Sequence, residues 1–264
     1  GAFHNSHERF DTPKCHPETR TALLDMIWSW VNNRQHTSSI MWLHGPAGAG
    51  KSAISQTIAE KCEKDKTLCA TFFFSRTGVK RNTANHLIAT IAHQLIQAIP
   101  QLEKPIIEAV ESDSALFSLS LQVQIRRLLV NPILEDSPQL IILDGLDECE
   151  NPEIQKLILT EILEALMTFS IPLCFLVASR PELALREAFN TGIMQKLSTR
   201  LTLDNSFNPE KDIETFLRSK FTEIVQTHQL HRSFPLNWPS DHAVQTLIGQ
   251  SSGQFIYASV VMKY

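Results

Sequence analysis

The sequence has 264 residues, of which 43% are hydrophobic and 20% are charged. These values are ordinary for a soluble globular protein with one large domain, or with one domain and a small appendage. The net charge of −4 points to neither a nucleic acid nor an anionic membrane as a partner. No stretch approaches the roughly 20 apolar residues that span a bilayer, and no signal peptide is present, so we expect a cytoplasmic protein.

The five cysteines and ten histidines show no spacing typical of a zinc site. The odd number of cysteines indicates reduced, mostly buried thiols. The sequence begins with Gly rather than Met and ends inside an apolar periodic run at 261–264. We therefore expect it to be a fragment of a longer protein.

The first elements along the chain alternate between helix and strand. Residues 1–18 are polar and predict an extended lead-in segment. Apolar residues at helical spacing predict helices over 20–31 and 51–64. Short apolar runs bounded by turn residues predict buried strands over 40–43 and 70–74.

The middle of the chain carries the clearest helical pattern, over residues 83–99, which Pro100 ends. Further helix is predicted over 105–130, with an interruption near 112–120.

The remaining strands are predicted over 140–143, 172–178 and 196–203, and an amphipathic helix is predicted over 153–169. Strands that are apolar on both faces and alternate with helices are typical of a parallel sheet covered on both sides.

After about residue 207 the pattern indicates helices alone. We therefore predict an α/β fold of the P-loop NTPase type, with a five-stranded parallel sheet followed by a small all-helical subdomain. The predicted units are a lead-in segment and helix (1–38), a nucleotide-binding domain (39–206) and a truncated helical subdomain (207–264).

The segment between the first strand and its helix matches the phosphate-binding pattern GxxxxGK[ST], the Walker A motif, in full. Its glycines let successive backbone N–H groups point at phosphate oxygens, and the helix N-terminus favours the same anions. Lys51 is expected to reach the β- and γ-phosphates, and Ser52 to bind Mg²⁺. The predicted nucleotide-binding residues are Gly45, Pro46, Ala47, Gly48, Ala49, Gly50, Lys51 and Ser52.

Acidic residues follow the third strand. Asp144 is expected at its carboxyl-terminal tip, where ligands collect in open α/β sheets, and we assign it to the metal together with Ser52. Asp147 and Glu148 come in the next turn, and at least one of them is expected to position an attacking water. The alternative is that both are ordinary exposed acids at the start of a loop.

Arg180 closes the fourth strand, between Ser179 and Pro181. From that position an arginine can bond a γ-phosphate and report its presence. The alternative is a surface arginine before a proline turn.

Together these motifs resemble the NACHT family of P-loop signalling NTPases (STAND class), in the fungal type that is similar to the N-terminal region of nephrocystin-3. The most specific part is the cluster Asp144-Gly145-Leu146-Asp147-Glu148 after an apolar strand. Weaker similarities cover the lead-in at 14–20 and the segments 90–95, 212–217 and 253–258. The last of these lacks the proline of the family's glycine–small–proline motif, so the contact of that proline with the base is not carried over.

The resemblance implies a switch rather than a metabolic enzyme. ADP is expected to hold a closed state, and exchange for ATP to open it and permit oligomerisation, with Asp147, Glu148 and Arg180 supporting slow hydrolysis. Effector and repeat domains would flank the module in a fungal-type innate-immunity or incompatibility receptor. The absence of an NKxD tetrapeptide after the third strand favours ATP over GTP, although GTP remains possible because some fungal members are thought to use it.

Three other classes of protein remain open. A small-molecule kinase needs an arginine-rich lid, whereas Arg126-Arg127 and the group Arg76, Lys80 and Arg81 look like solvated or interface charges. An AAA+ motor or a helicase acting on nucleic acid is disfavoured by the acidic balance. An interaction module with an inactive nucleotide site is the third alternative.

Overall fold

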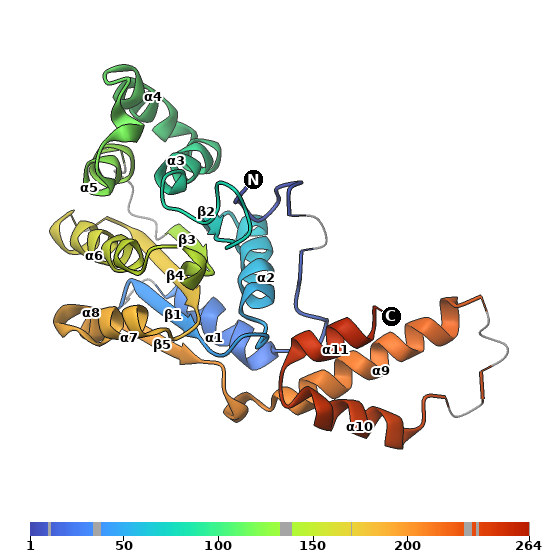
Figure 1. The fold of residues 1–264 in the computed structure, drawn as a ribbon. Coiled ribbons are helices and arrows are strands. Elements are labelled where there is room, and N and C mark those ends of the chain that lie inside the picture. Colours follow the sequence, from blue (N-terminus) through green and yellow to red (C-terminus); the bar gives the residue numbers. More distant parts are fainter. Residues whose placement is uncertain are drawn as a thin grey trace.

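The computed structural model describes residues 1–9, 12–33, 38–132, 139–169, 171–229, 234–235 and 238–263. Its centre is a five-stranded sheet with the strand order β2-β3-β4-β1-β5, and every pair of neighbours is parallel (Figure 1). β4 therefore lies between β1 and β3. The strands are β1 (Ile40–His44), β2 (Leu68–Phe73), β3 (Gln139–Asp144), β4 (Leu173–Ser179) and β5 (Ser198–Thr202).

Helices cover both faces of the sheet, as the apolar strands predicted. In β3, Leu140 and Ile142 pack with α1 (Thr21–Asn32) and α2 (Lys51–Lys64), whereas the alternate residues Ile141 and Leu143 face the opposite core. That second core contains residues of α3 (Leu87–Ala98), α4 (Glu103–Glu111), α5 (Leu121–Ile125), α6 (Pro152–Phe169), α7 (Leu183–Asn190) and α8 (Gly192–Leu197). None of the described helices has the length and apolarity that a membrane crossing requires.

A separate helical lobe follows the sheet and lies beside the N-terminal end of α1 (Figure 1). It consists of α9 (Pro209–Thr227), α10 (Asp241–Ser251) and α11 (Phe255–Val261). The lobe has its own small core, formed by Ile213, Leu217, Val244, Ile248 and Ala258. The predicted all-helical subdomain is thus confirmed.

The outer edge of β2 is covered rather than open. The side-chain amide of Gln94 on α3 accepts from the backbone N–H of Thr71 (3.0 Å) and donates to its carbonyl (2.9 Å), as a neighbouring strand would. The backbone N–H of Phe73 donates to the carbonyl of Ala2 (2.8 Å). These contacts satisfy backbone groups that an edge strand otherwise presents to other chains.

Several element boundaries differ from the predictions. The helix predicted over 83–99 begins only at Leu87, because the preceding loop is held by mutual hydrogen bonds between Asn82 and Glu150. The strand predicted over 196–203 begins at Ser198, after the short helix α8, and α7 was not predicted. The helix predicted over 105–130 does break between α4 and α5, and its last part, Arg126–Val130, has π-helical hydrogen bonding. The final helix ends at Val261, and Tyr264 lies outside the described residues.

Candidate functional site

The phosphate-binding segment forms a tight loop between the end of β1 and the start of α2. Gly48 and Gly50 have φ angles of 74° and 93°, which residues with a Cβ rarely adopt. At Gly45 the constraint is space, because a Cβ there would lie 2.8 Å from the Cβ of Leu203. α2 begins at Lys51, so the free N–H groups and positive dipole end of this helix adjoin the loop. The arrangement suits an anion.

The amine of Lys51 is folded back onto this loop. Its Nζ donates to the carbonyls of Gly45 (2.9 Å) and Pro46 (2.8 Å). Burial lowers the pKa of Lys51, while the charges of Asp147 and Asp144 raise it. Because an anionic phosphate oxygen is a stronger acceptor than a neutral carbonyl, the amine gains by exchanging one for the other.

Asp144 ends β3 and is buried, with 3% of its surface exposed. Burial raises the pKa of its carboxyl group, and the hydroxyls of Ser52 and Ser55 together with the charges of Arg9 and Lys51 lower it. Its Oδ1 and the Ser55 hydroxyl are both buried. Among the described residues neither makes a hydrogen bond of good geometry, although the serine hydroxyls lie near enough to the carboxylate to lower its pKa. Unpartnered buried oxygens of this kind are costly unless something fills the site.

These oxygens fit a divalent cation that is shared with phosphate. Carboxylate and hydroxyl oxygens are the ligands that Mg²⁺ prefers, and the ion usually takes one or two protein ligands besides water and phosphate. Within the described ranges no group of three or more His, Cys, Asp or Glu side chains forms a metal site on its own. A magnesium ion held by Ser52 and Asp144 would therefore depend on the phosphates for the rest of its coordination.

The Asp147 carboxylate contacts Arg180. Its buried carboxylate accepts from the backbone N–H of Arg180 (2.9 Å) and lies 3.4 Å from the Arg180 Nε. The carboxylate is 3% exposed, whereas the arginine side chain is 44% exposed. Asp147 therefore holds the backbone and the Nε of Arg180 in place, while the arginine side chain stays accessible. This favours a role for Asp147 in orienting Arg180 over a role in orienting water.

Glu148 is differently placed. It ends the 3₁₀ turn Leu146–Glu148, and its Oε2 accepts from the backbone N–H of Arg76 (3.0 Å). None of the ion pairs found among the described residues includes Glu148. The turn is set by Gly145, which has a φ of 70° and donates its N–H to the carbonyl of Ala178 (2.8 Å). Glu148 is the better placed of the two acids to accept a proton from water.

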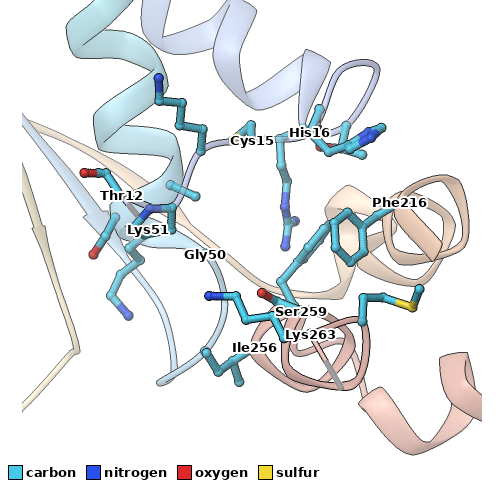
Figure 2. A pocket seen from close by; sticks show the side chains of 18 of the residues that line it. Thr12, Cys15, His16, Gly50, Lys51, Phe216, Ile256, Ser259 and Lys263 are labelled. Atoms are coloured by element: carbon cyan, nitrogen blue, oxygen red, sulfur yellow. Dashed lines mark hydrogen bonds between the residues drawn. The ribbon is translucent and has the colours of Figure 1, made fainter. Parts of the chain in front are cut away.

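A cavity of about 620 Å³ joins these groups to the helical lobe. Figure 2 shows Thr12 and Lys51 on one side of it, and His16 and Phe216 on the other. The lead-in segment and helices α9 and α11 complete its wall. The predicted site residues that line it are Ala47, Gly48, Gly50, Lys51, Ser52, Asp144, Asp147, Glu148 and Arg180. Gly45, Pro46 and Ala49 belong to the loop itself.

The family model described as "Nephrocystin 3, N-terminal" matches residues 19–180, which is more than half of the chain. The chain belongs to the nephrocystin-3 N-terminal family. The predicted resemblance to NACHT-type P-loop NTPases is thereby confirmed, and with the fold it supports a nucleotide-binding P-loop module. No curated protein matches the sequence.

One solved structure shares the fold of this nephrocystin-3 N-terminal family member at low identity, and two others are more distantly similar. A chain of Drosophila ORC bound to DNA is 14% identical, with a TM-score of 0.52, and the match covers 92% of this chain and 54% of that one. The ADP form of Aeropyrum pernix ORC2 is 16% identical, with a TM-score of 0.43 and coverages of 83% and 56%. C. elegans PCH-2 is 10% identical, with a TM-score of 0.43 and coverages of 90% and 58%. The chain thus spans little more than half the length of these proteins.

Sequence reasoning missed the role of Arg20, which contacts the P-loop and two helices of the lobe. Its side chain is 4% exposed and donates through Nη2 to the carbonyl of Ala49 in the P-loop (3.1 Å). Its Nε lies 3.7 Å from the carboxylate of Asp212 on α9, and that carboxylate also accepts from the Arg20 backbone N–H (3.2 Å). The guanidinium stands over the ring of Phe255 on α11, 4.9 Å from its centroid. Arg20 thus ties the P-loop to the lobe.

The lobe also touches the P-loop directly. The backbone N–H of Ile256 on α11 donates to the carbonyl of Gly48 (3.3 Å). A Cβ at Gly48 would lie 2.5 Å from the Cγ2 of Ile256. The tip of the P-loop and α11 therefore constrain one another.

Arg76 is exposed, which agrees with the prediction of a solvated charge, but it also contacts the acidic turn after β3. Besides the contact of its N–H with Glu148, its Nη2 donates to the carbonyl of Asp147 (3.3 Å). Arg127 pairs with Asp113 (2.7 Å). The signal available for Arg76 was its position just after β2, at the carboxyl edge of the sheet where the acidic turn also lies.

Proposed function

We propose that this chain is a nucleotide-dependent switch that binds ATP, or GTP, together with Mg²⁺, and hydrolyses it slowly. The proposal is carried by a cavity that is bounded by the P-loop on one side and by the helical lobe on the other. A ligand that fills such a cavity touches both parts, so its identity is able to bias how they sit together.

The triphosphate would lie at the P-loop end. Lys51 would exchange its two loop carbonyls for β- and γ-phosphate oxygens, and the start of α2 would supply backbone N–H groups. Ser52 and Asp144 would hold Mg²⁺, which when bound neutralises part of the phosphate charge.

The base would lie at the lobe end. Aromatic and apolar side chains there include Phe216, Phe255, Ile224 and Met262, and His16 meets the Phe216 ring edge to face at 5.6 Å. Flat, apolar surfaces of this kind suit a purine ring. ATP is preferred over GTP because no NKxD tetrapeptide follows the third strand.

Hydrolysis would use the two groups at the γ-phosphate end. Glu148 would accept the proton of the attacking water, and the guanidinium of Arg180 would bond the γ-phosphate. When that phosphate leaves, Arg180 keeps Asp147 but loses its second partner. The arginine would thereby report which nucleotide is bound.

At the level of the whole protein, we propose that triphosphate binding promotes self-association through this domain. Flanking effector and repeat domains would then carry signal and input, as in a fungal-type innate-immunity receptor. A cytoplasmic location, and no partnership with nucleic acid or membrane for this segment, complete the proposal.

The mass of the protein in solution, measured with ADP and then with a non-hydrolysable ATP analogue, tests the switch. We expect a larger species with the analogue, and the same assay on Arg180→Ala should show no difference between the nucleotides. A small-molecule kinase would stay monomeric with both and turn over quickly with an acceptor. A protein that binds neither nucleotide would be an interaction module with an inactive site.

A further inference from the structure

The first nine residues form a strap, here called the N-terminal strap, that lies against β2 and α2 (Figure 1). Besides the bond from Phe73 to Ala2, the backbone N–H of His4 donates to the Thr71 hydroxyl (2.8 Å). The amide of Gln56 on α2 donates to the His4 carbonyl (3.1 Å). Ala2 and His4 are both buried, so the strap is a packed part of the fold.

Arg9 is the charged end of this strap. Its guanidinium lies over the ring of Phe73, 3.4 Å from the centroid, and its Nη1 donates to Gln56 Oε1 (2.8 Å) and to the His4 carbonyl (3.3 Å). None of the ion pairs found among the described residues includes it. The cation is therefore held by a ring and by neutral oxygens.

These contacts place Arg9 on the face of the sheet where the Asp144 carboxylate lies. Phe73 is the residue of β2 that pairs with Asp144 on β3, and Gln56 lies one helical turn after Ser52 on α2. The charge of Arg9 accordingly lowers the pKa of Asp144, and the charge of Asp144 raises the pKa of Arg9. Burial has the larger effect on Arg9 and lowers its pKa to about 10. Arg9 stays protonated at neutral pH and stands as a counter-charge to Asp144.

We propose that Arg9 is a positioning residue for the metal site, which stabilises the Asp144 carboxylate before Mg²⁺ arrives and is repelled once the ion is bound. This inference rests on the proposed function, since it assumes that Asp144 helps to bind the metal. Because coupling between two binding events is reciprocal, a metal that weakens the docking of Arg9 must itself bind more tightly when Arg9 is uncharged. The N-terminal strap would thus be fastened in the metal-free state and loosened in the metal-bound state.

The test measures metal affinity rather than turnover. Protein saturated with ADP is titrated with Mn²⁺, a paramagnetic probe for a magnesium site, and free Mn²⁺ is read by electron paramagnetic resonance. We expect Arg9→Gln to bind Mn²⁺ about three- to fifteenfold more tightly than wild type at low ionic strength, and the gain to shrink with added salt. Arg9→Lys, which keeps the charge, should stay close to wild type. Lys64→Gln is the matched control, because Lys64 borders the same strap but lies in the last turn of α2, far along the helix from Ser52.

A second readout follows the strap itself. The backbone N–H of Phe73, which is bonded to Ala2, should exchange with solvent faster in wild type when Mn²⁺ is added, and this dependence should vanish in Arg9→Gln. Equal Mn²⁺ affinity in wild type and Arg9→Gln, or a Phe73 exchange rate indifferent to the metal in wild type, would overturn the inference alone. A wild-type protein that binds neither ADP nor Mn²⁺ would overturn the proposed function and this inference with it.

Discussion

At the scale of single residues, the two acids of the turn after β3 have different environments although they are neighbours in sequence. The carboxylate of Asp147 is buried against Arg180, whereas that of Glu148 accepts the backbone N–H of Arg76 and lines the cavity. From the sequence alone either acid qualified as the water-positioning group. The two acids differ in the burial of their carboxylates and in the groups that they contact. Both properties depend on how the turn packs against the end of β4.

This difference predicts opposite consequences for two isosteric variants. Glu148→Gln should leave nucleotide affinity within about twofold and slow hydrolysis by about 10²- to 10⁴-fold, the usual effect of losing a general base. Asp147→Asn should instead weaken the preference for ATP over ADP, because Arg180 loses its charged anchor. Single-turnover hydrolysis and equilibrium binding of both nucleotides measure the two effects. If Glu148→Gln hydrolyses at the wild-type rate, Asp147 takes its place as the candidate.

Arg20 supports a second prediction at this scale. Truncation to Ala removes the partner of Asp212 and the bond to the Ala49 carbonyl, so we expect a loss of about 2 to 4 kcal/mol in the free energy of unfolding. Arg218→Ala is the matched control, since it also removes an arginine paired with acids, Glu214 and Asp241, but at a site 47% exposed. That change should cost less than about 1 kcal/mol. Chemical denaturation compares them, and equal losses would contradict the role given to Arg20.

At the scale of elements, the features that could be predicted from the sequence are those that depend on local residue patterns. The strands around β3 are apolar on both faces, and the P-loop motif carries its own spacing, so the order of strand, loop and helix follows directly. The position of β4 between β1 and β3 does not, because nothing local in Leu173–Ser179 names its neighbours. The contact of Arg20 with Asp212 spans 192 positions, and only the packed lobe brings them together. α7 and α8 have only eight and six residues, which is too short for a helical period to stand out in the sequence.

The contact between the P-loop and α11 makes a prediction at the same scale. Gly48→Ala introduces a Cβ at a φ of 74° and 2.5 Å from Ile256 Cγ2, so it should destabilise the protein by about 1 to 3 kcal/mol. Ile256→Ala in the same chain should restore part of that loss, because it removes the Cγ2 atom at 2.5 Å, while the backbone strain and the close Cβ of residue 256 at 3.3 Å remain. Gly249→Ala is the control: this glycine lies inside α10 with nothing within 4 Å, and the change should stabilise by about 0.5 to 1 kcal/mol. Additive losses for Gly48 and Ile256 would show that the two elements are not coupled.

At the scale of the whole molecule, the cavity is lined by both lobes, and under the proposed function it has a phosphate end and a base end. Phe216→Ala should therefore weaken ATP binding by about 1 to 3 kcal/mol, the range measured for stacking of a base on an aromatic ring. Inorganic triphosphate, which has no base, should bind the variant and wild type alike. Phe221→Ala is the control on the same helix, since that ring packs against Trp238 at 5.3 Å and does not line the cavity. Equal effects on ATP and triphosphate would place the base elsewhere.

Equilibrium binding of ADP and of a non-hydrolysable ATP analogue, each with Mg²⁺, tests whether this chain binds a nucleotide through its P-loop. Wild type should bind both. Lys51→Ala should bind each about ten- to a hundredfold more weakly, which is the loss expected for one or two charge-assisted hydrogen bonds to phosphate. Equal binding by Lys51→Ala and wild type would contradict the account.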